Sequence, residues 1–469
     1  MIGCQDQPAT GPARSVPSAT ASTGAAVSRL DEAEMAAFAR AVPGLGGYYF
    51  GPEGELVVNL TPAADPSAAQ GALAAVARRG NGRVQARPAS YTFLELQAWR
   101  DALVDPLLAL AEVASVDLDE EHNRVTVGVT TDAARGAVHA LAAQLGVPVP
   151  ALRIVPGSYV VPQDTTVYGP YLYTTPVEGN TLNGYRSVLE GGLQLGFRRE
   201  GMEPNTFTFC TLGFNAVLNG YRVVITNTHC SDKTWDRDNT AYFQPQPGDG
   251  RHVGFEYKDP NGSSCGFLSP NVCRSADASA AYVESTVSTR IGYIARPLGP
   301  PPFGRSPYGT LYGSTVIDAA APNFQIVGKH TADEGLVVDK VGAVTGWTSG
   351  KVTSTCVDVK VRYRSWSVMR CQKYATYSST GGDSGAPVFE YYPDGTVRLV
   401  GIHWGETDDR SRAVFSSIAN VENELGSLFV TAGSGGGSTG GGDGGGATTP
   451  PPGDGTGGGP GGCAGECVT

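Results

Sequence analysis

The sequence contains, at residues 381–388, the stretch Gly381-Gly382-Asp383-Ser384-Gly385-Ala386-Pro387-Val388. Glycines on both sides of Ser384 allow the backbone to turn sharply and leave the hydroxyl accessible. The amides of Gly382 and Ser384 can then point at a developing oxyanion. A glycine-rich turn carries no chemistry by itself, so a catalytic role for Ser384 requires a base and a carboxylate elsewhere in the chain.

The candidate base is His229, at the end of Val223-Val224-Ile225-Thr226-Asn227-Thr228-His229-Cys230. Its β-branched apolar residues predict a buried strand that delivers the histidine to the strand's end. An imidazole in that position can reach both a serine hydroxyl and a carboxylate. The alternative is a hydrogen-bonded structural histidine.

The candidate carboxylate is Asp277, which lies among small residues just before the apolar run 278–283. Such an acid can be buried, accept the imidazole N–H and fix its tautomer. The competitors are Asp259, in a stretch of turn composition, and Asp318, which lies far along the chain. We choose Asp277.

Taken in the order His229, Asp277, Ser384, these motifs resemble the chymotrypsin-like serine proteases, in particular the bacterial branch of streptogrisins and α-lytic protease. The stretches 341–350 and 414–418 strengthen the resemblance, which covers about residues 190 to 430. It implies an all-β fold of two antiparallel six-stranded β-barrels with a C-terminal helix. It also implies that Asp383 is a buried acid that shapes the oxyanion loop. The Asn227-Thr228 pair departs from the small residues usual before the histidine.

The residues themselves also predict a β-rich domain. Short β-branched runs at 206–212, 223–226, 281–287, 351–361 and 397–402 are separated by Gly, Asn, Asp and Pro, and only 418–429 has helical spacing.

Substrate preference is predicted from the residues around the serine. Ser378, six positions before Ser384, replaces the acid of trypsin-like pockets, which disfavours Lys or Arg before the scissile bond. The stretch Gly401-Ile402-His403-Trp404-Gly405 resembles bacterial glutamyl endopeptidases, where this histidine contacts the substrate carboxylate, and Ser379 falls at their small hydroxyl residue. The resemblance implies a preference for Glu before the scissile bond. In the alternative interpretation, His403 is a packed residue of the pocket wall and the enzyme prefers small or apolar residues.

Nine cysteines indicate an oxidising compartment and an exported protein. Four pairs of cysteines close in sequence are expected to form disulfides: Cys210–Cys230, Cys265–Cys273, Cys356–Cys371 and Cys463–Cys467. The protease resemblance also implies the Cys210–Cys230 bond. The sequence has no Cys-x₂-Cys pair or clustered His, so no metal or other cofactor is expected.

The remaining Cys4, in Met1-Ile2-Gly3-Cys4, resembles the end of a bacterial lipoprotein signal, although the basic and apolar parts of such a signal are missing. Either Cys4 is lipidated or it is a free thiol. Residues 1–28 are expected to be a signal remnant and flexible tether.

The net charge of −11 argues against nucleic acid as a partner. The sequence contains no run of about twenty apolar residues that could span a bilayer. We expect polypeptide substrates and a monomer. Residues 161–189 are expected to connect two domains, and the Gly-rich residues 431–469 to form a flexible tail.

Residues 29–160 predict a separate small α/β domain. Hairpins are expected at 47–59 and 113–129, and helices at 67–79, 92–113 and 133–145, the last capped by Asp132. The acidic run Asp117, Asp119, Glu120, Glu121 is interpreted as a solvated turn rather than a metal site.

In position and in residues 116–129 this domain is similar to the pro-regions of α-lytic-type proteases. The similarity implies a folding chaperone and inhibitor of the protease, and Glu190 before Gly191 is a candidate junction where the protease could cut its own chain. A permanent accessory domain is the alternative. For the whole chain, a catalytically silent protease-like binding protein remains the rival of an active serine endopeptidase.

Overall fold

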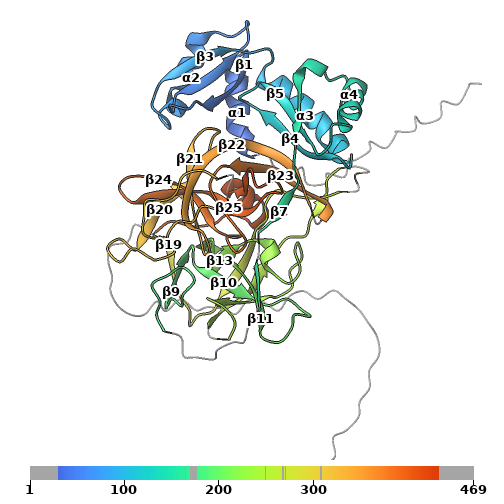
Figure 1. Cartoon of the computed structure of the whole chain (residues 1–469). Helices are drawn as coiled ribbons and strands as arrows, with labels where there is room; N and C mark the ends of the chain where they lie inside the picture. The colour runs from blue at the N-terminus through green and yellow to red at the C-terminus, as the bar shows by residue number, and fades with distance from the viewer. Residues whose placement is uncertain are drawn as a thin grey trace, which may run out of the picture.

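The computed structural model describes residues 30–163, 165–168, 177–248, 250–266, 269, 271–306, 309–362 and 364–432. Cys4, Cys463, Cys467 and nearly all of the tether and tail lie outside these residues. The described chain is mostly β-sheet. An N-terminal unit stands on one side of a larger β-rich unit (Figure 1).

The N-terminal unit alternates helices and strands. Its elements are α1 (Leu30–Ala41), β1 (Leu45–Phe50), β2 (Leu56–Leu60), α2 (Pro66–Ala77), β3 (Val84–Pro88), α3 (Phe93–Leu108), β4 (Val113–Asp119), β5 (Arg124–Val129), α4 (Ala134–Gln144), η1 (Val149–Ala151) and β6 (Leu152–Pro156).

Both expected hairpins and all three expected helices of this unit are confirmed. Thr92 and Glu95 form a capping box at the start of α3. The predicted cap of α4 is wrong: Ala133 occupies the N-cap without a side-chain bond, and Asp132 pairs with Arg135 instead.

The larger unit is built from short strands. They are β7 (Val160–Pro162), β8 (Thr165–Tyr168), β9 (Val188–Gly191), β10 (Gln194–Phe197), β11 (Thr206–Thr211), β12 (Phe214–Leu218), β13 (Tyr221–Thr226), β14 (Ala241–Gln244), β15 (Arg251–Lys258), β16 (Ser263–Ser264), β17 (Val272–Arg274), β18 (Ser279–Val283), β19 (Ser288–Ala295), β20 (Asn323–Lys329), β21 (Val337–Gly342), β22 (Gly346–Val361), β23 (Arg364–Ala375), β24 (Pro387–Tyr391), β25 (Thr396–Thr407) and β26 (Ala413–Ser417). The short helices are η2 (Thr228–Cys230) and α5 (Ile418–Leu425).

These strands form two sheets. The first has the order β12-β13-β18-β15-β14-β10-β11-β8, and the second contains β23-β26-β25-β24-β21-β22. The expected strands and the closing helix are found, and the two six-stranded barrels remain a prediction. One buried apolar cluster includes residues of both sheets, such as Ile225 and Ile402. The catalytic candidates lie where these sheets meet.

The N-terminal unit extends the second sheet. β4 pairs antiparallel with β22, with Val116 opposite Asp358, so that β4-β5-β6 continue the sheet beyond β22. Cys273 and Val368 of the larger unit are buried in the hydrophobic core of the N-terminal unit. The two units therefore share both a sheet and a core.

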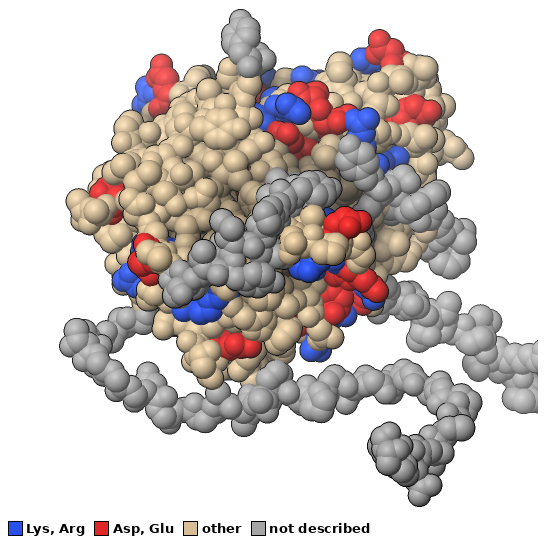
Figure 2. Space-filling view, turned by 60° about the horizontal axis from the view of Figure 1, so that its bottom comes forward, with Lys and Arg blue, Asp and Glu red and all other residues tan. Residues whose placement is uncertain are grey.

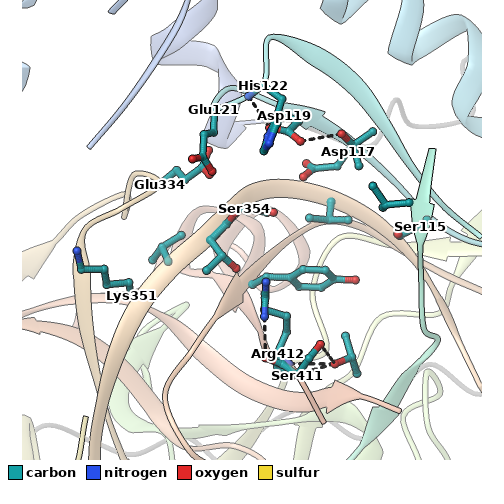
Figure 3. A pocket seen from close by; sticks show the side chains of 18 of the residues that line it. Ser115, Asp117, Asp119, Glu121, His122, Glu334, Lys351, Ser354, Ser411 and Arg412 are labelled. Atoms are coloured by element: carbon teal, nitrogen blue, oxygen red, sulfur yellow. Dashed lines mark hydrogen bonds and ion pairs between the residues drawn. The ribbon is translucent and has the colours of Figure 1, made fainter. Parts of the chain in front are cut away.

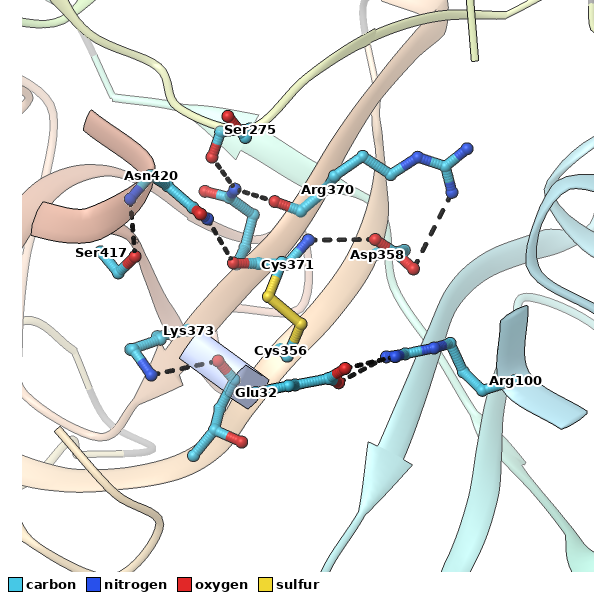
Figure 4. Close-up of a disulfide and its surroundings, with 12 residues drawn as sticks. Glu32, Arg100, Ser275, Cys356, Asp358, Arg370, Cys371, Lys373, Ser417 and Asn420 are labelled. Carbon is cyan, nitrogen blue, oxygen red and sulfur yellow. Dashed lines mark hydrogen bonds and ion pairs between the residues drawn. A yellow bond between two sulfur atoms is a disulfide. The ribbon is translucent and has the colours of Figure 1, made fainter. Parts of the chain in front are cut away.

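A disulfide braces the hairpin that carries this junction. Cys356 of β22 is bonded to Cys371 of β23, and the Cys371 amide donates to the buried Asp358 carboxylate at 3.0 Å (Figure 4). Close by, the buried Arg100 of α3 binds Glu32 of α1 through both of its terminal nitrogens.

Charge is not sorted by sign on the face shown in Figure 2, where acidic and basic side chains lie intermixed on a largely uncharged surface. Among the described residues, no helix is both long and apolar enough to cross a membrane.

Candidate active site

Three side chains from distant parts of the chain meet at one point. His229 Nδ1 lies 2.7 Å from Asp277 Oδ2, and His229 Nε2 lies 2.8 Å from Ser384 Oγ. All three residues are buried. This arrangement lets the imidazole take the serine proton while the carboxylate holds its other nitrogen.

The histidine is fixed by its local structure. His229 sits in η2, directly after β13, and the disulfide Cys210–Cys230 ties this turn to β11. Although Cys210, His229 and Cys230 cluster closely, both sulfurs are bonded to each other, so no thiolate is free to ligate a metal.

The carboxylate is held from several sides. Asp277 precedes β18, and its backbone amide donates to Ser416 Oγ at 3.0 Å. Its Oδ1 also accepts the His229 amide at 3.3 Å. The competitor Asp259 is bonded to Arg274 and Thr228, and Asp318 accepts the Ala320 amide. Among the three acids, only Asp277 is hydrogen-bonded to the His229 ring.

Two glycines are required by the serine turn. Gly382 and Gly385 have φ of +92° and +91°, where side chains are disfavoured. A Cβ on Gly382 would lie 2.5 Å from the Phe209 ring, and one on Gly385 would lie 2.0 Å from the Thr211 carbonyl oxygen.

A buried ion pair supports the same turn. Asp383 accepts from Lys340 Nζ at 2.9 Å and from Thr345 Oγ1 at 2.6 Å. Its other oxygen accepts the amides of Val344 and Thr345 at 3.0 and 3.1 Å. Burial lowers the pKa of Lys340, and the Asp383 charge opposes that shift. Lys340 was not singled out by sequence reasoning, because nothing near it in the chain marks it as buried.

A backbone segment that follows the N-terminal unit is hydrogen-bonded to the serine turn and to β25. Residues 160–162 form β7, which pairs antiparallel with β25 so that Pro162 lies opposite Gly405. The Gln163 amide donates to the Trp404 carbonyl at 3.1 Å, and the Gln163 carbonyl accepts the Gly382 amide at 2.7 Å. Ser384 follows two residues after Gly382 in the same turn, so the carbonyl of Gln163 sits where an oxyanion donor points.

The side chain of Gln163 reaches the histidine predicted to determine specificity. Gln163 Oε1 lies 2.7 Å from His403 Nε2, and His403 Nδ1 lies 3.1 Å from the Tyr377 hydroxyl. Burial lowers the pKa of His403 well below its usual range, and the charges of Lys340, Arg305 and His229 add to that effect.

The other predicted pocket residues have different partners. Ser378 Oγ accepts the Leu311 amide at 2.8 Å, and Ser379 Oγ lies 3.5 Å from Arg305 Nη1. Within the described residues, neither serine is hydrogen-bonded to Gln163. Gly405 supplies backbone opposite Pro162. Tyr377 and Gln163 were missed by sequence reasoning; the short Val-Val-Pro run before Gln163 was the signal for a strand.

The suggested junction at Glu190 is not bonded to the serine turn among the described residues. Glu190 belongs to β9, which pairs with β19, and its buried carboxylate binds Arg290 at 2.7 Å and Asn323. The residue whose carbonyl accepts the Gly382 amide is Gln163.

The three disulfides expected among the described residues are confirmed: Cys210–Cys230, Cys265–Cys273 and Cys356–Cys371.

A second recess lies between the two units, away from Ser384. It has a volume of about 460 Å³ and is lined by Asp117, Asp119 and Glu121 from the N-terminal unit and by Glu334 from the larger one (Figure 3). The interpretation of the acidic run as a solvated turn is wrong for Asp117 and Glu120, which are buried. Thr355 of β22 donates to Glu120 at 3.2 Å, and Asp117 lines the recess together with Ser354 of the same strand.

No protein-family model matches the sequence, and no curated protein sequence matches it. Several solved structures of bacterial serine proteases resemble the fold. Thermobifida fusca Protease A is 18% identical, with a TM-score of 0.32, over 52% of this chain and 100% of that one. A glutamic acid specific serine protease described as using a histidine triad in substrate binding is 20% identical, with a TM-score of 0.33, over 52% and 100%. The Nocardiopsis protease is 17% identical, with a TM-score of 0.31, over 52% and 100%.

Proposed function

We propose that this protein is a serine endopeptidase that hydrolyses peptide bonds through an acyl-enzyme. The observation that carries the proposal is the continuous hydrogen-bonded series from Asp277 through His229 to Ser384 Oγ. Ser384 attacks the carbonyl carbon, His229 accepts its proton and returns it to the leaving amine, and Asp277 stabilises the imidazolium. The amides of Gly382 and Ser384 hold the oxyanion.

The chain is proposed to be made as an inactive precursor. The N-terminal unit leads directly into β7, and β7 with Gln163 fills the cleft that a substrate would use. An external polypeptide can bind only after this segment has left. We therefore propose that residues 29–160 form an inhibitory pro-domain rather than a permanent accessory domain.

The paired cysteines favour export into an oxidising compartment. Lipid attachment at Cys4, a monomeric state and a preference for glutamate stay predictions. The alternative to glutamate is glutamine, because the side-chain amide of Gln163 lies against His403.

An active-site probe tests the reaction. A fluorophosphonate should form an adduct that peptide mass spectrometry locates on Ser384, and a His229→Ala variant should lose it, because the hydroxyl is no longer activated. If the protein stays unlabelled and leaves peptides intact even after limited proteolysis has removed the N-terminal unit and β7, the silent binding protein is favoured.

The contact between the units is expected to weaken as pH rises. Burial, and then the charge of Asp119, raises the pKa of Asp117 to about 7, and burial raises the pKa of Glu120 and Glu334. A carboxyl group whose pKa is higher in the docked state than in the free state stabilises the contact fully only at pH values below its free pKa, near 4. For Asp117 that stabilisation is lost as pH rises through about 7.

The measurement is the thermal midpoint of the full-length Ser384→Ala variant, which cannot digest itself, at pH 5 and pH 8. We expect a lower midpoint at pH 8. Adding Asp117→Asn removes one titrating group and should reduce the difference; an unchanged difference would exclude Asp117 as a cause.

A further inference from the structure

We infer that this active site selects glutamine on the amino side of the scissile bond, and that the chain first cuts itself after Gln163. The inference rests on the proposed function and names its substrate class. It differs from the preference for glutamate and from the junction at Glu190 that the sequence suggested.

The backbone of residues 160–163 lies as a substrate would. Antiparallel pairing with β25 fixes its direction, and the bond from Gln163 N to the Trp404 carbonyl fixes its register. The Gln163 carbonyl oxygen is 2.7 Å from the Gly382 amide. The peptide bond that this donor would polarise is therefore the one that follows Gln163.

The pocket for the side chain presents a neutral donor. Tyr377 is fully buried, and burial raises the pKa of its hydroxyl, which stays protonated. If the hydroxyl donates to His403 Nδ1, the ring proton is on Nε2, which faces Gln163 Oε1 at 2.7 Å. An amide oxygen is the acceptor that such an N–H requires.

A glutamate carboxylate fits this pocket less well because the nearby cations are already engaged. Lys340 binds Asp383, and Arg305 binds Glu406 and the Tyr377 carbonyl. His403 is held neutral by its lowered pKa. Among the described residues, a carboxylate buried here would have no free counter-charge in contact. That costs more than leaving Gln163 Nε2 without a partner, as it is in the part of the chain that the structure describes.

The cleavage step uses groups already in place. Ser384 Oγ forms an ester bond with the carbonyl carbon of Gln163, and the C–N bond to residue 164 breaks. The serine proton passes through His229 to the leaving amine. A water molecule then attacks the ester carbon and gives a proton to His229. The bond from that carbon to Ser384 Oγ breaks, His229 returns the proton to Oγ, and the new carboxyl group on Gln163 loses its own proton to solvent.

The first test follows the full-length protein by intact mass spectrometry. The wild type should yield fragments 1–163 and 164–469, whereas Ser384→Ala should stay whole. At pH 8 the nearly isosteric Gln163→Glu variant should be cut at this site at least about tenfold more slowly. A first cut after Glu190, or equal rates for both chains, would overturn the inference.

The second test needs no variant of the segment. Peptides that copy residues 158–166, with Gln, Glu, Asn or Leu at the position of Gln163, are offered to the wild-type preparation. The ratio of kcat/KM for Gln over Glu should be at least about ten at pH 8. A ratio below one would show that glutamate is preferred.

We assign Tyr377 as a residue that positions the His403 ring, and the Gln over Glu ratio of kcat/KM tests this assignment. Tyr377→Phe removes the donor to Nδ1 and frees the ring to change tautomer, so the Gln over Glu ratio should fall by about tenfold. The matched control is Tyr242→Phe, which removes the hydroxyl of another fully buried tyrosine, and it should keep the wild-type ratio. Equal falls in both variants would mean a general packing effect and would overturn the assignment.

The two levels of proposal fail differently. Ser384-dependent cleavage after residues other than glutamine overturns the inference and leaves the endopeptidase in place. Absence of both peptide cleavage and a Ser384 adduct overturns the proposed function, and the inference with it.

Discussion

Replacing Ser384 by alanine is expected to lower kcat/KM on a peptide substrate by a factor on the order of 10⁶, because the nucleophile of the acyl-enzyme is lost. The fold should survive, since Ser384 Oγ is bonded only to His229 and to the Trp404 carbonyl at 3.2 Å among the described residues. The measurement is the initial rate of peptide hydrolysis with the variant purified free of wild-type enzyme.

A double variant provides the control. If His229 and Ser384 act as one unit, Ser384→Ala combined with His229→Ala should be no slower than Ser384→Ala alone. A multiplicative loss would mean that His229 acts separately from the serine. Activity near the wild-type level in Ser384→Ala would assign the chemistry to a different residue.

Replacing Asp383 by asparagine should lower the free energy of unfolding by about 3–5 kcal/mol, because the fully buried Lys340 would lose its ion-pair partner. Hydrolysis should fall as well, since the carboxylate also accepts the amides that hold the serine turn. The free energy is measured by urea unfolding in the Ser384→Ala background, which prevents self-digestion.

The matched comparison is the Lys340→Met, Asp383→Asn double variant, in which no buried charge is left alone. It should regain a large part of the lost stability. A double variant as unstable as Asp383→Asn would show that the amides bound by the carboxylate, rather than the charge of Lys340, account for the loss.

Local pattern was sufficient for the parts of the site that depend on neighbours in sequence. The apolar run before His229 predicted β13, and the glycines around Ser384 predicted a turn that the structure has at positive φ. The pairing of Cys210 with Cys230 followed from their positions around one hairpin.

Contacts between residues far apart in the sequence could not be predicted from local pattern. Gln163 and His403 are 240 residues apart, and their contact accompanies the pairing of β7 with β25. Asp117 and Glu120 look like solvent-exposed acids in their own hairpin, but they are buried in a unit whose sheet continues into β22. Local pattern can also mislead. Asp132 is a residue type that often caps a helix, but its carboxylate pairs with Arg135 and α4 has no side-chain cap.

The pairing of β4 with β22 has a consequence if the N-terminal unit is removed, as we propose. The stretch of β22 around Asp358 and Val359 would then lose its neighbour and become an open sheet edge. Open edges invite pairing with other chains, and inward-pointing charges and lysines oppose it. Asp358 and Lys360 stand in this stretch, so the strand that pairs with the N-terminal unit also carries charges that would oppose aggregation once that unit is gone.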